Sequence, residues 1–179
     1  MAIWQYNLDF MPRVKLLRQF GEIPSSLDNW EACDLGMFDG VRIPSNFQSL
    51  LTRLGKFTPL NWVPGSINYG DYDVGSHLTI YGLGTDTAHV SSRLDVGNWN
   101  EDFAIVVLEF AKACECLLLT KNDVVIEPDY DSLVADVRVS SSFRFCNDPK
   151  GYLLSDELKE LNENITTNLS DGKFNPNSC

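Results

Sequence analysis

The residue types best suited to chemistry gather in one short stretch, residues 68–77, with the sequence NYGDYDVGSH. The carboxylates of Asp71 and Asp73 stand two residues apart, and the imidazole of His77 follows. These groups are common ligands of transition metals, so the three side chains could serve a metal-dependent hydrolase. An EF-hand calcium loop is excluded, because its sixth and twelfth positions require glycine and glutamate, where this chain has serine and glycine. An acidic surface loop without metal is the simpler interpretation.

The same stretch combines tyrosine with negative charge. Tyrosine is enriched at binding hot spots, and a carboxylate beside it suits Arg or Lys on a partner. We therefore predict a partner-binding surface, with an ordinary loop as an equal alternative for the two tyrosines. The predicted surface consists of Tyr69, Asp71, Tyr72, Asp73 and His77.

The other candidate nucleophiles are better explained by packing. Cys114 closes an apolar helical face and Cys116 enters an apolar segment, so both are expected to be core cysteines. Alternation turns Ser92 inward, and no Gly-x-Ser-x-Gly sequence or phosphate-binding glycine pattern occurs. We therefore expect no enzyme, no catalytic residues, no metal and no cofactor.

Composition narrows the class of partner. The 179 residues include 14 Lys and Arg against 25 Asp and Glu, which gives a net charge of −11. Such a chain repels phosphate backbones and anionic lipid, so binding to nucleic acid or to a membrane surface is disfavoured. A basic protein partner is favoured, and high solubility is the alternative reason for the charge.

The chain contains no apolar run near the length of a membrane span, and its first residues do not resemble a secretory signal. The number of cysteines is five, an odd count. Without an export signal these cysteines are expected to be free thiols, and the protein is expected to be cytoplasmic.

Alternating and helical spacing of apolar residues predicts the elements. A half-buried strand is expected over residues 3–10, and a short helix between Pro12 and Gly21. Residues 21–44 are expected to form an irregular loop. Further helices are predicted over residues 47–54, 103–114, 130–137 and after 155, and strands near 40–43 and over 60–63, 116–120, 124–126 and 143–145. Capping boxes at Ser45 and Asn98 are expected to start two of the helices.

The stretch at residues 68–77 leads into a predicted β-hairpin. Apolar residues occupy the even positions of both expected strands, 77–82 and 88–96. Only a connecting loop of odd length puts both apolar rows on one face. This register places His77 near Arg93 and separates His77 from His89 by about 13 Å, too far for the two to share a metal. Each histidine is expected to be exposed.

These elements predict an α+β fold, with a mainly antiparallel sheet and helices packed on one face. The order hairpin, helix, strand makes the fold partly ferredoxin-like. A single domain is expected over residues 1–168, followed by a flexible tail over residues 169–179.

Three segments together carry a family resemblance. They are IWQY at residues 3–6 with Pro12 after it, VSSRLDV at residues 90–96 ahead of a helix, and FRFCNDPKGYL at residues 143–153. The chain resembles, over about half its length, small bacterial proteins regarded as immunity proteins of contact-dependent or type VI toxin systems. This resemblance implies a cytosolic binder that neutralises a cognate toxin.

Charge and resemblance together predict an immunity protein that occludes the active site of a basic toxin through its acidic, tyrosine-bearing surface. The alternative is the metal-dependent hydrolase that uses Asp71, Asp73 and His77. A third possibility is a scaffold that dimerises through an open sheet face or edge. The oligomeric state stays open at this point.

Overall fold

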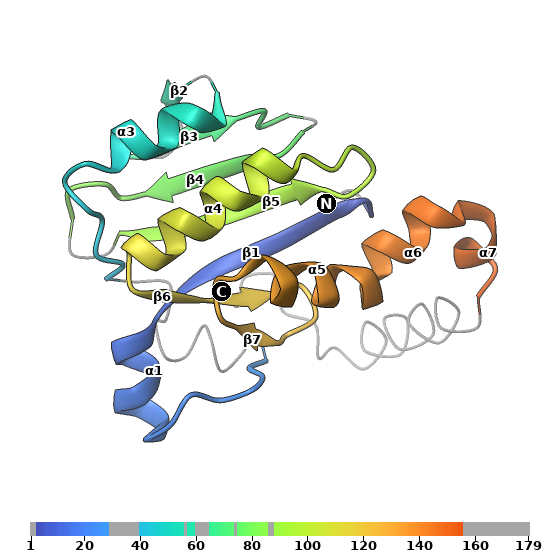
Figure 1. Cartoon of the computed structure of the whole chain (residues 1–179), viewed down its shortest axis with the longest axis horizontal. Helices are drawn as coiled ribbons and strands as arrows, with labels where there is room; N and C mark the ends of the chain where they lie inside the picture. The colour runs from blue at the N-terminus through green and yellow to red at the C-terminus, as the bar shows by residue number, and fades with distance from the viewer. Residues whose placement is uncertain are drawn as a thin grey trace, which may run out of the picture.

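The computed structural model describes residues 3–28, 40–55, 57–59, 65–73, 75–85 and 88–155. It confirms the predicted α+β class with an antiparallel sheet (Figure 1). In the described residues one sheet has the strand order β2-β3-β4-β5-β1-β6-β7, and neighbouring strands are antiparallel. The strands are β1 (Gln5–Pro12), β2 (Phe57–Pro59), β3 (Ile67–Gly70), β4 (His77–Tyr81), β5 (His89–Asp95), β6 (Cys116–Thr120) and β7 (Val125–Ile126).

The helices are mostly short and α4 is the longest of those described. They are α1 (Arg13–Phe20), α3 (Phe47–Leu51), the 3-10 helix η1 (Thr52–Leu54), α4 (Glu101–Ala113), α5 (Tyr130–Val139), α6 (Ser141–Asn147) and α7 (Pro149–Leu153). None of the helices in the described ranges is both long enough and apolar enough to cross a bilayer.

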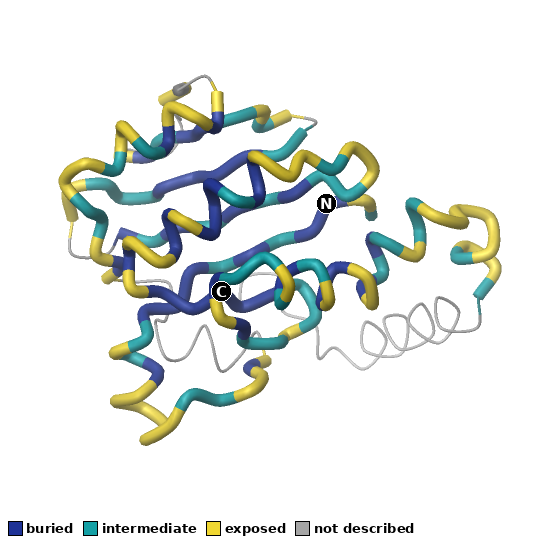
Figure 2. Tube along the Cα trace, in the orientation of Figure 1, coloured by how far each residue is buried: buried dark blue, intermediate teal, exposed yellow. Residues whose placement is uncertain are grey.

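Helices α3, α4 and α5 lie on one face of the sheet and enclose the main core (Figure 1). The even-numbered residues Tyr6, Leu8 and Phe10 of β1 project into this layer and are fully buried. The rings of Phe10 and Phe110 of α4 lie 5.9 Å apart between centroids. Figure 2 shows the buried residues running along the central strands and the inward side of α4. Burial of these large side chains, worth about 1.5–3 kcal/mol each, is the main force that joins helices to sheet.

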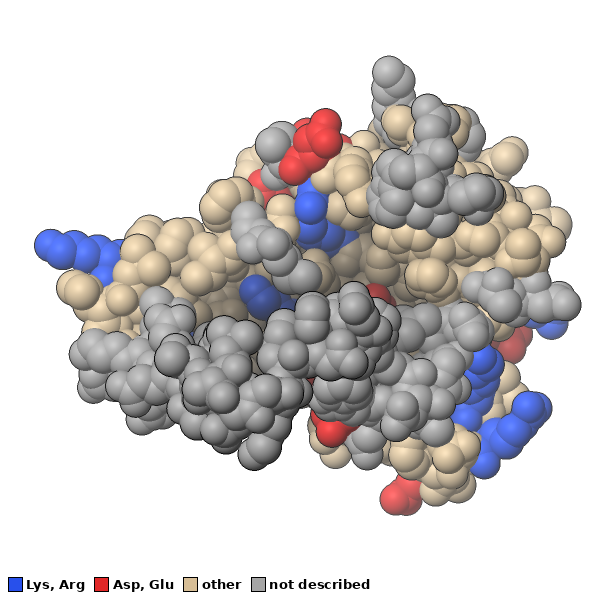
Figure 3. Space-filling view, turned by 180° about the vertical axis from the view of Figure 1, so that it is seen from behind, with Lys and Arg blue, Asp and Glu red and all other residues tan. Residues whose placement is uncertain are grey.

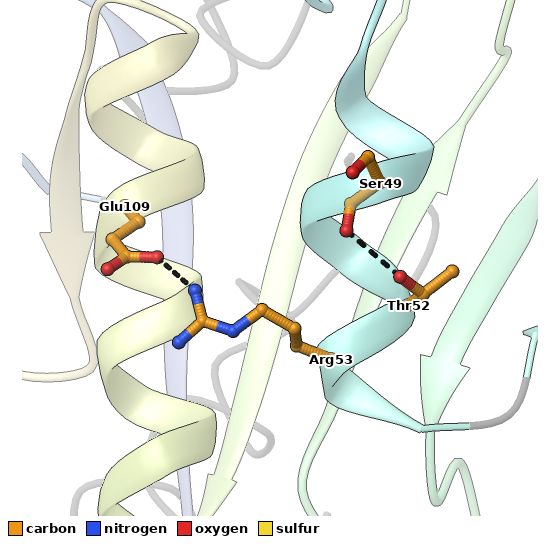
Figure 4. A network of polar contacts seen from close by, with 4 residues as sticks. All are labelled: Ser49, Thr52, Arg53 and Glu109. Carbon is orange, nitrogen blue, oxygen red and sulfur yellow. Dashed lines mark hydrogen bonds and ion pairs between the residues drawn. The ribbon is translucent and has the colours of Figure 1, made fainter.

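An ion pair joins the segment formed by α3 and η1 to α4 at the surface of this layer (Figure 4). Arg53 of η1 reaches across to Glu109 of α4, with 2.6 Å between Nη1 and Oε2. Within the short segment itself, the Thr52 hydroxyl donates to the Ser49 carbonyl oxygen at 2.9 Å. Both charged side chains are about half exposed, so the pair contributes at most about 1 kcal/mol.

Helix α1 packs on the opposite face, at one end of the sheet. Its Leu16 shares a small apolar cluster with Met11 of β1, Leu117 and Leu119 of β6, and Leu27. The odd-numbered positions of β1 are therefore apolar where α1 covers them and polar farther along the strand. The face of the sheet opposite α3, α4 and α5 is therefore polar over β3, β4, β5 and the first part of β1.

Several predicted elements are confirmed. The hairpin has the expected register, because His77 pairs with Arg93 and Tyr81 pairs with His89. The strand predicted at residues 116–120 is β6, and it is buried at every position.

The two predicted capping boxes are wrong. Asn46, not Ser45, precedes α3, and its side chain makes no capping hydrogen bond. Asn100, not Asn98, caps α4, and its Oδ1 accepts from the backbone N–H of Phe103 at 3.0 Å. The reason is that the turn after β5 uses two more residues before the chain can enter the helix.

The strand predicted over residues 143–145 is a helix, α6. The Ser140 hydroxyl caps it by accepting from Phe143 N–H, and the side chain of Phe143 packs against the core. Ser142 is buried and donates to the Gln5 carbonyl oxygen at 2.8 Å. The alternation of two phenylalanines around an arginine fits a helix turned partly outward as well as it fits a strand.

Other predictions concern segments without a described element. No strand forms at residues 40–43, where Val41 makes one backbone hydrogen bond to Ala88. The strand expected at residues 60–63, the helix after residue 155, the domain boundary at residue 168 and the tail over residues 169–179 lie outside the described residues.

Candidate functional site

The polar face of the sheet, turned away from α4 and α5, brings side chains from four strands into line. Strand pairing aligns Asp9 of β1 with Ser91 of β5, and Ser91 with Thr79 of β4. Thr79 pairs in turn with Asn68 of β3, and its hydroxyl donates to the Asn68 Oδ1 at 2.9 Å. One row of hydrogen-bonding groups therefore crosses the sheet from Asn68 to Asp9.

A second row lies beside the first. It aligns Asn7 of β1 with Arg93 of β5, and Arg93 with His77 of β4. Because neighbouring strands are about 4.8 Å apart, the two rows bring polar groups from three strands within reach of one bound group. Figure 3 shows this side of the molecule, where basic side-chain atoms lie in a hollow and acidic atoms lie at its edge.

A cavity of about 300 Å³ opens on this face. That volume is at the small end of the range for ligand pockets, which suits a single chemical group rather than a large molecule. Three strands and the loop after β3 supply its lining. From β1 come Gln5, Asn7 and Asp9, from β4 His77 and Tyr81, from β5 Ser91 and Arg93, and from the loop Tyr72.

His77 is the most constrained member of the cavity wall. It is only 7% exposed, and its ring lies 4.8 Å from that of Tyr72 between centroids. Burial, together with the nearby charge of Arg93, lowers the pKa of His77 to about 4, so the imidazole is neutral at pH 7. Its ring hydrogen-bonds to the backbone of Asp71, whereas Nδ1 is buried and has no hydrogen-bond partner among the described residues.

Asp9 supplies the carboxylate of the cavity. Burial raises its pKa to about 6, which still leaves it ionised at pH 7. The carboxylate lies close enough to Tyr81 to contribute to the raised pKa of that phenol, for which burial is the main cause. No Lys or Arg in the described part of the chain forms an ion pair with Asp9. The cavity therefore contains a desolvated negative charge without a matching cation.

Arg93 fixes the loop at residues 71–76 to the sheet. Its guanidinium donates from Nε to the Gly75 carbonyl oxygen at 3.3 Å and from Nη2 to the Tyr72 carbonyl oxygen. Asp71 closes the loop from within, because its N–H donates to the Ser76 carbonyl oxygen and its Oδ1 accepts from the following Asp73 N–H. These bonds hold residues 71–73 and 75–76 beside the cavity.

The charge of Arg93 is itself balanced by the loop. Burial lowers the pKa of Arg93, and the negative charges of Asp71, Asp95 and Asp73 oppose that change. Three carboxylates thus act on one guanidinium, and the carboxylate of Asp9 lines the same cavity. The local potential is therefore negative even though an arginine lines the cavity.

The predicted partner-binding residues divide into three groups. Asp71 and Asp73 are exposed and Tyr72 is half-buried, as a contact loop requires. His77 lines the cavity instead of standing exposed as predicted, because Tyr72 covers its ring. Tyr69 is misplaced by the prediction: it lies in β3, is 2% exposed and packs in the main core, so it cannot contact a partner.

The predicted metal ligands are not gathered into a site. Across the described ranges, which include Asp71, Asp73 and His77, no three His, Cys, Asp or Glu side chains are placed to hold one metal ion. The reason is visible in the loop: the Asp71 Oδ1 accepts from the backbone, while His77 turns under Tyr72. The geometry gives no support to the metal-dependent hydrolase.

The cysteines behave as predicted for core residues. Cys114 and Cys116 are 3% and 2% exposed, and burial raises the pKa of both thiols, that of Cys116 to about 12. A thiol that stays protonated in this way is a poor nucleophile.

Sequence reasoning did not identify Asp9, Tyr81 or Arg93 as members of a site. The available signal was the alternation of Gln5, Asn7 and Asp9 on one side of the first strand. What the sequence did not contain was the pairing of β1 with β5, which brings that side next to the polar side of the hairpin.

A larger cavity, of about 670 Å³, lies near α1 on another part of the surface. Two of its charged residues are already paired, since Arg13 forms an ion pair with Glu127 at 2.5 Å. Its wall includes the exposed apolar residues Val14 and Leu17. No buried polar atom without a partner is found among its described residues, so it gives less indication of a ligand than the cavity on the polar face.

Comparison of the chain with protein-family models, with curated proteins and with solved structures finds no match to any of them. The function is therefore inferred from the cavity and the loop beside it.

Proposed function

We propose that this protein is a non-enzymatic immunity protein that neutralises a basic protein toxin by covering its active site. The single observation that supports this best is the acidic loop at residues 71–76, which Arg93 fixes to the sheet next to a cavity of negative potential. A loop held in its binding conformation loses little entropy on association, which favours a tight complex.

The composition of the loop suits such a partner. Asp71 and Asp73 are exposed beside the half-buried ring of Tyr72, a combination that complements Arg and Lys on the facing protein. The net charge of −11 extends the same preference over the whole molecule and accelerates encounter with a positively charged toxin. Because a toxin that acts on nucleic acid has a basic active-site cleft, an acidic surface is suited to cover it.

Co-expression with the toxin encoded next to this gene tests the proposal. Growth should be rescued by the wild-type protein and lost with the double variant Tyr72→Ala/Asp73→Asn, which alters the contact loop without touching the core. Asp123→Asn is a matched control, since it removes one exposed carboxylate at a turn far along the chain and should still rescue growth. Failure of the wild-type protein to rescue growth against any neighbouring toxin would disprove this function.

A further inference from the structure

The cavity on the polar face has a more specific chemistry than a general contact surface. The residues that line its roughly 300 Å³ supply a carboxylate without an ion pair among the described residues, an imidazole whose buried Nδ1 has no partner there, and two phenol rings. We propose that this cavity receives the cationic head of one Lys or Arg side chain of the toxin, with Asp9 as its counter-ion.

The hydrogen-bonding pattern of His77 indicates that the group bound in the cavity is a hydrogen-bond donor. The bond of its ring to the Asp71 backbone raises the pKa, so it is donated by a ring N–H to a carbonyl oxygen. Since Nδ1 has no partner among the described residues, the donor is Nε2. The lone pair of Nδ1 is then left unsatisfied in the wall of the cavity, and it is an acceptor that suits an ammonium or guanidinium N–H.

The aromatic rings supply a second reason. Tyr72 lies against His77, and Tyr81 is stacked on His89 with 4.5 Å between ring centroids and 15° between planes. Both tyrosines line the cavity. Faces of phenol rings attract a cation when water is excluded, which adds to the attraction of the carboxylate.

Arg93, which already lines the cavity, does not prevent a second cation from binding there. Arg93 is turned to the loop carbonyls of Tyr72 and Gly75, and three carboxylates lie around it. Asp9 stands in the other row of the sheet, paired with Ser91. A second cation would therefore meet Asp9 first, and it would relieve the desolvation that now raises the pKa of this carboxyl.

In naming a toxin side chain as the guest, the inference rests on the proposed function, whereas the preference of the cavity for a cation does not. A small probe tests that preference directly. Nα-acetyl-arginine amide carries the guanidinium, and Nα-acetyl-citrulline amide is a neutral analogue of nearly the same shape. Each is titrated against the full-length protein at pH 7.5 while the side-chain NMR signals of His77 and Arg93 are followed.

The arginine probe should shift both signals in a saturable way, and the citrulline probe should bind at least tenfold more weakly. Asp9→Asn should weaken binding of the arginine probe at least tenfold, while Asp123→Asn, which removes the same charge elsewhere, should leave it unchanged. Asp9→Asn removes a desolvated charge, so a folding defect is not expected, and circular dichroism checks that it folds. Equal binding of the two probes, or no effect of Asp9→Asn, overturns the inference.

The toxin assay separates this inference from the proposed function. If the wild-type protein and Asp9→Asn both rescue growth and the arginine probe does not bind, the cavity is no cation site and the immunity function stands. If the probe binds through Asp9 but no neighbouring toxin is neutralised, the cation site stands and the proposed function is wrong.

Discussion

Arg93 holds Gly75 in place, with 3.3 Å between its Nε and the glycine carbonyl oxygen, and through the same guanidinium it also binds the carbonyl of Tyr72. One side chain of β5 thus fixes both halves of the loop that follows β3. The acidic loop is for this reason an extension of the sheet and not an independent segment.

Replacement of Arg93 by lysine should release the loop. A single ammonium cannot span two carbonyl oxygens as the planar guanidinium does, so we expect a loss of about 1–3 kcal/mol in unfolding free energy. Backbone amides at residues 72–76 should exchange hydrogen faster, as measured by mass spectrometry. Arg53→Lys, at the exposed ion pair with Glu109, is the control and should cost less than about 1 kcal/mol. Unchanged exchange in the loop would show that Arg93 does not fix it.

Asp9 should reduce stability at neutral pH. Its pKa is 3.8 in the unfolded chain and about 6 when folded, so the folded state keeps a proton that the unfolded state loses between these values. Stability therefore falls as the pH rises through this window, by about 3 kcal/mol in total. Asp9→Asn should be more stable than the wild type by up to that amount at pH 7 and by little at pH 4, in urea unfolding experiments.

His77 should change the pH dependence of stability in the opposite direction to Asp9. Its pKa is 6.5 unfolded and about 4 folded, so the unfolded state gains the proton first and stability falls as the pH drops from 6.5 to 4. Relative to the wild type, His77→Gln should therefore gain stability on acidification, whereas Asp9→Asn should lose its advantage. Parallel pH profiles for the two variants would contradict the burial of these groups in one cavity.

Gly70 should tolerate no side chain. It ends β3 with a φ of +92°, and a Cβ there would lie 2.5 Å from the Ser76 carbonyl oxygen and 2.9 Å from Phe103. Gly70→Ala combines left-handed strain with overpacking, so we expect a loss of about 2–4 kcal/mol. Gly84→Ala is the matched control, because Gly84 has a φ of +86° and nothing within 4 Å of its Cβ position. Its cost should be about 1 kcal/mol, and equal costs in thermal unfolding would refute the steric argument.

Tyr6 should stabilise the fold through its hydroxyl as well as its ring. The hydroxyl donates to Asp136 Oδ2 in the core, which also accepts from Asn122 Nδ2 at 2.7 Å. Tyr6→Phe leaves a buried carboxylate with one donor fewer, so urea unfolding should show a loss of about 1–3 kcal/mol. Tyr130→Phe serves for comparison, since its half-buried hydroxyl makes a longer contact of 3.4 Å with Trp99 and its loss should cost less. A neutral result for Tyr6→Phe would mean that Asn122 satisfies Asp136 alone.

Much of the fold could be predicted because the spacing of apolar residues, and whether they fall at odd or even positions, are local properties of the sequence. The hairpin register at His77 and Arg93 followed from the requirement that both apolar rows share one face. The helix α4 followed from its long apolar stripe. The segment with Phe143 and Phe145 was ambiguous, because two aromatic residues two apart fit either period, and the Ser140 cap that decides for a helix depends on where α5 ends.

The site was predictable only in part, since it is made by pairing between distant strands. The proposed contact loop was predicted from residue types alone, and the structure shows that its Asp71 and Asp73 are exposed. Tyr69 was wrongly predicted to contact a partner, because β3 extends into the stretch that was expected to be a loop and buries this residue. Asp9 became part of the cavity only when β1 took its place beside β5, more than 80 residues later in the chain, with Asp9 opposite Ser91.

The central position of β1 also constrains how the chain folds. β1, which precedes the other described strands in the sequence, lies between β5 and β6, with Gln5 opposite Asp95 and Pro12 opposite Cys116. Its side chains cannot pair until β5 and β6 have been made, and closing loops over such separations is slow. During synthesis β1 is thus an unpaired, partly apolar strand, the kind of segment that aggregates or engages chaperones. Folding of this protein should therefore begin in the hairpin and α4, with β1 added last.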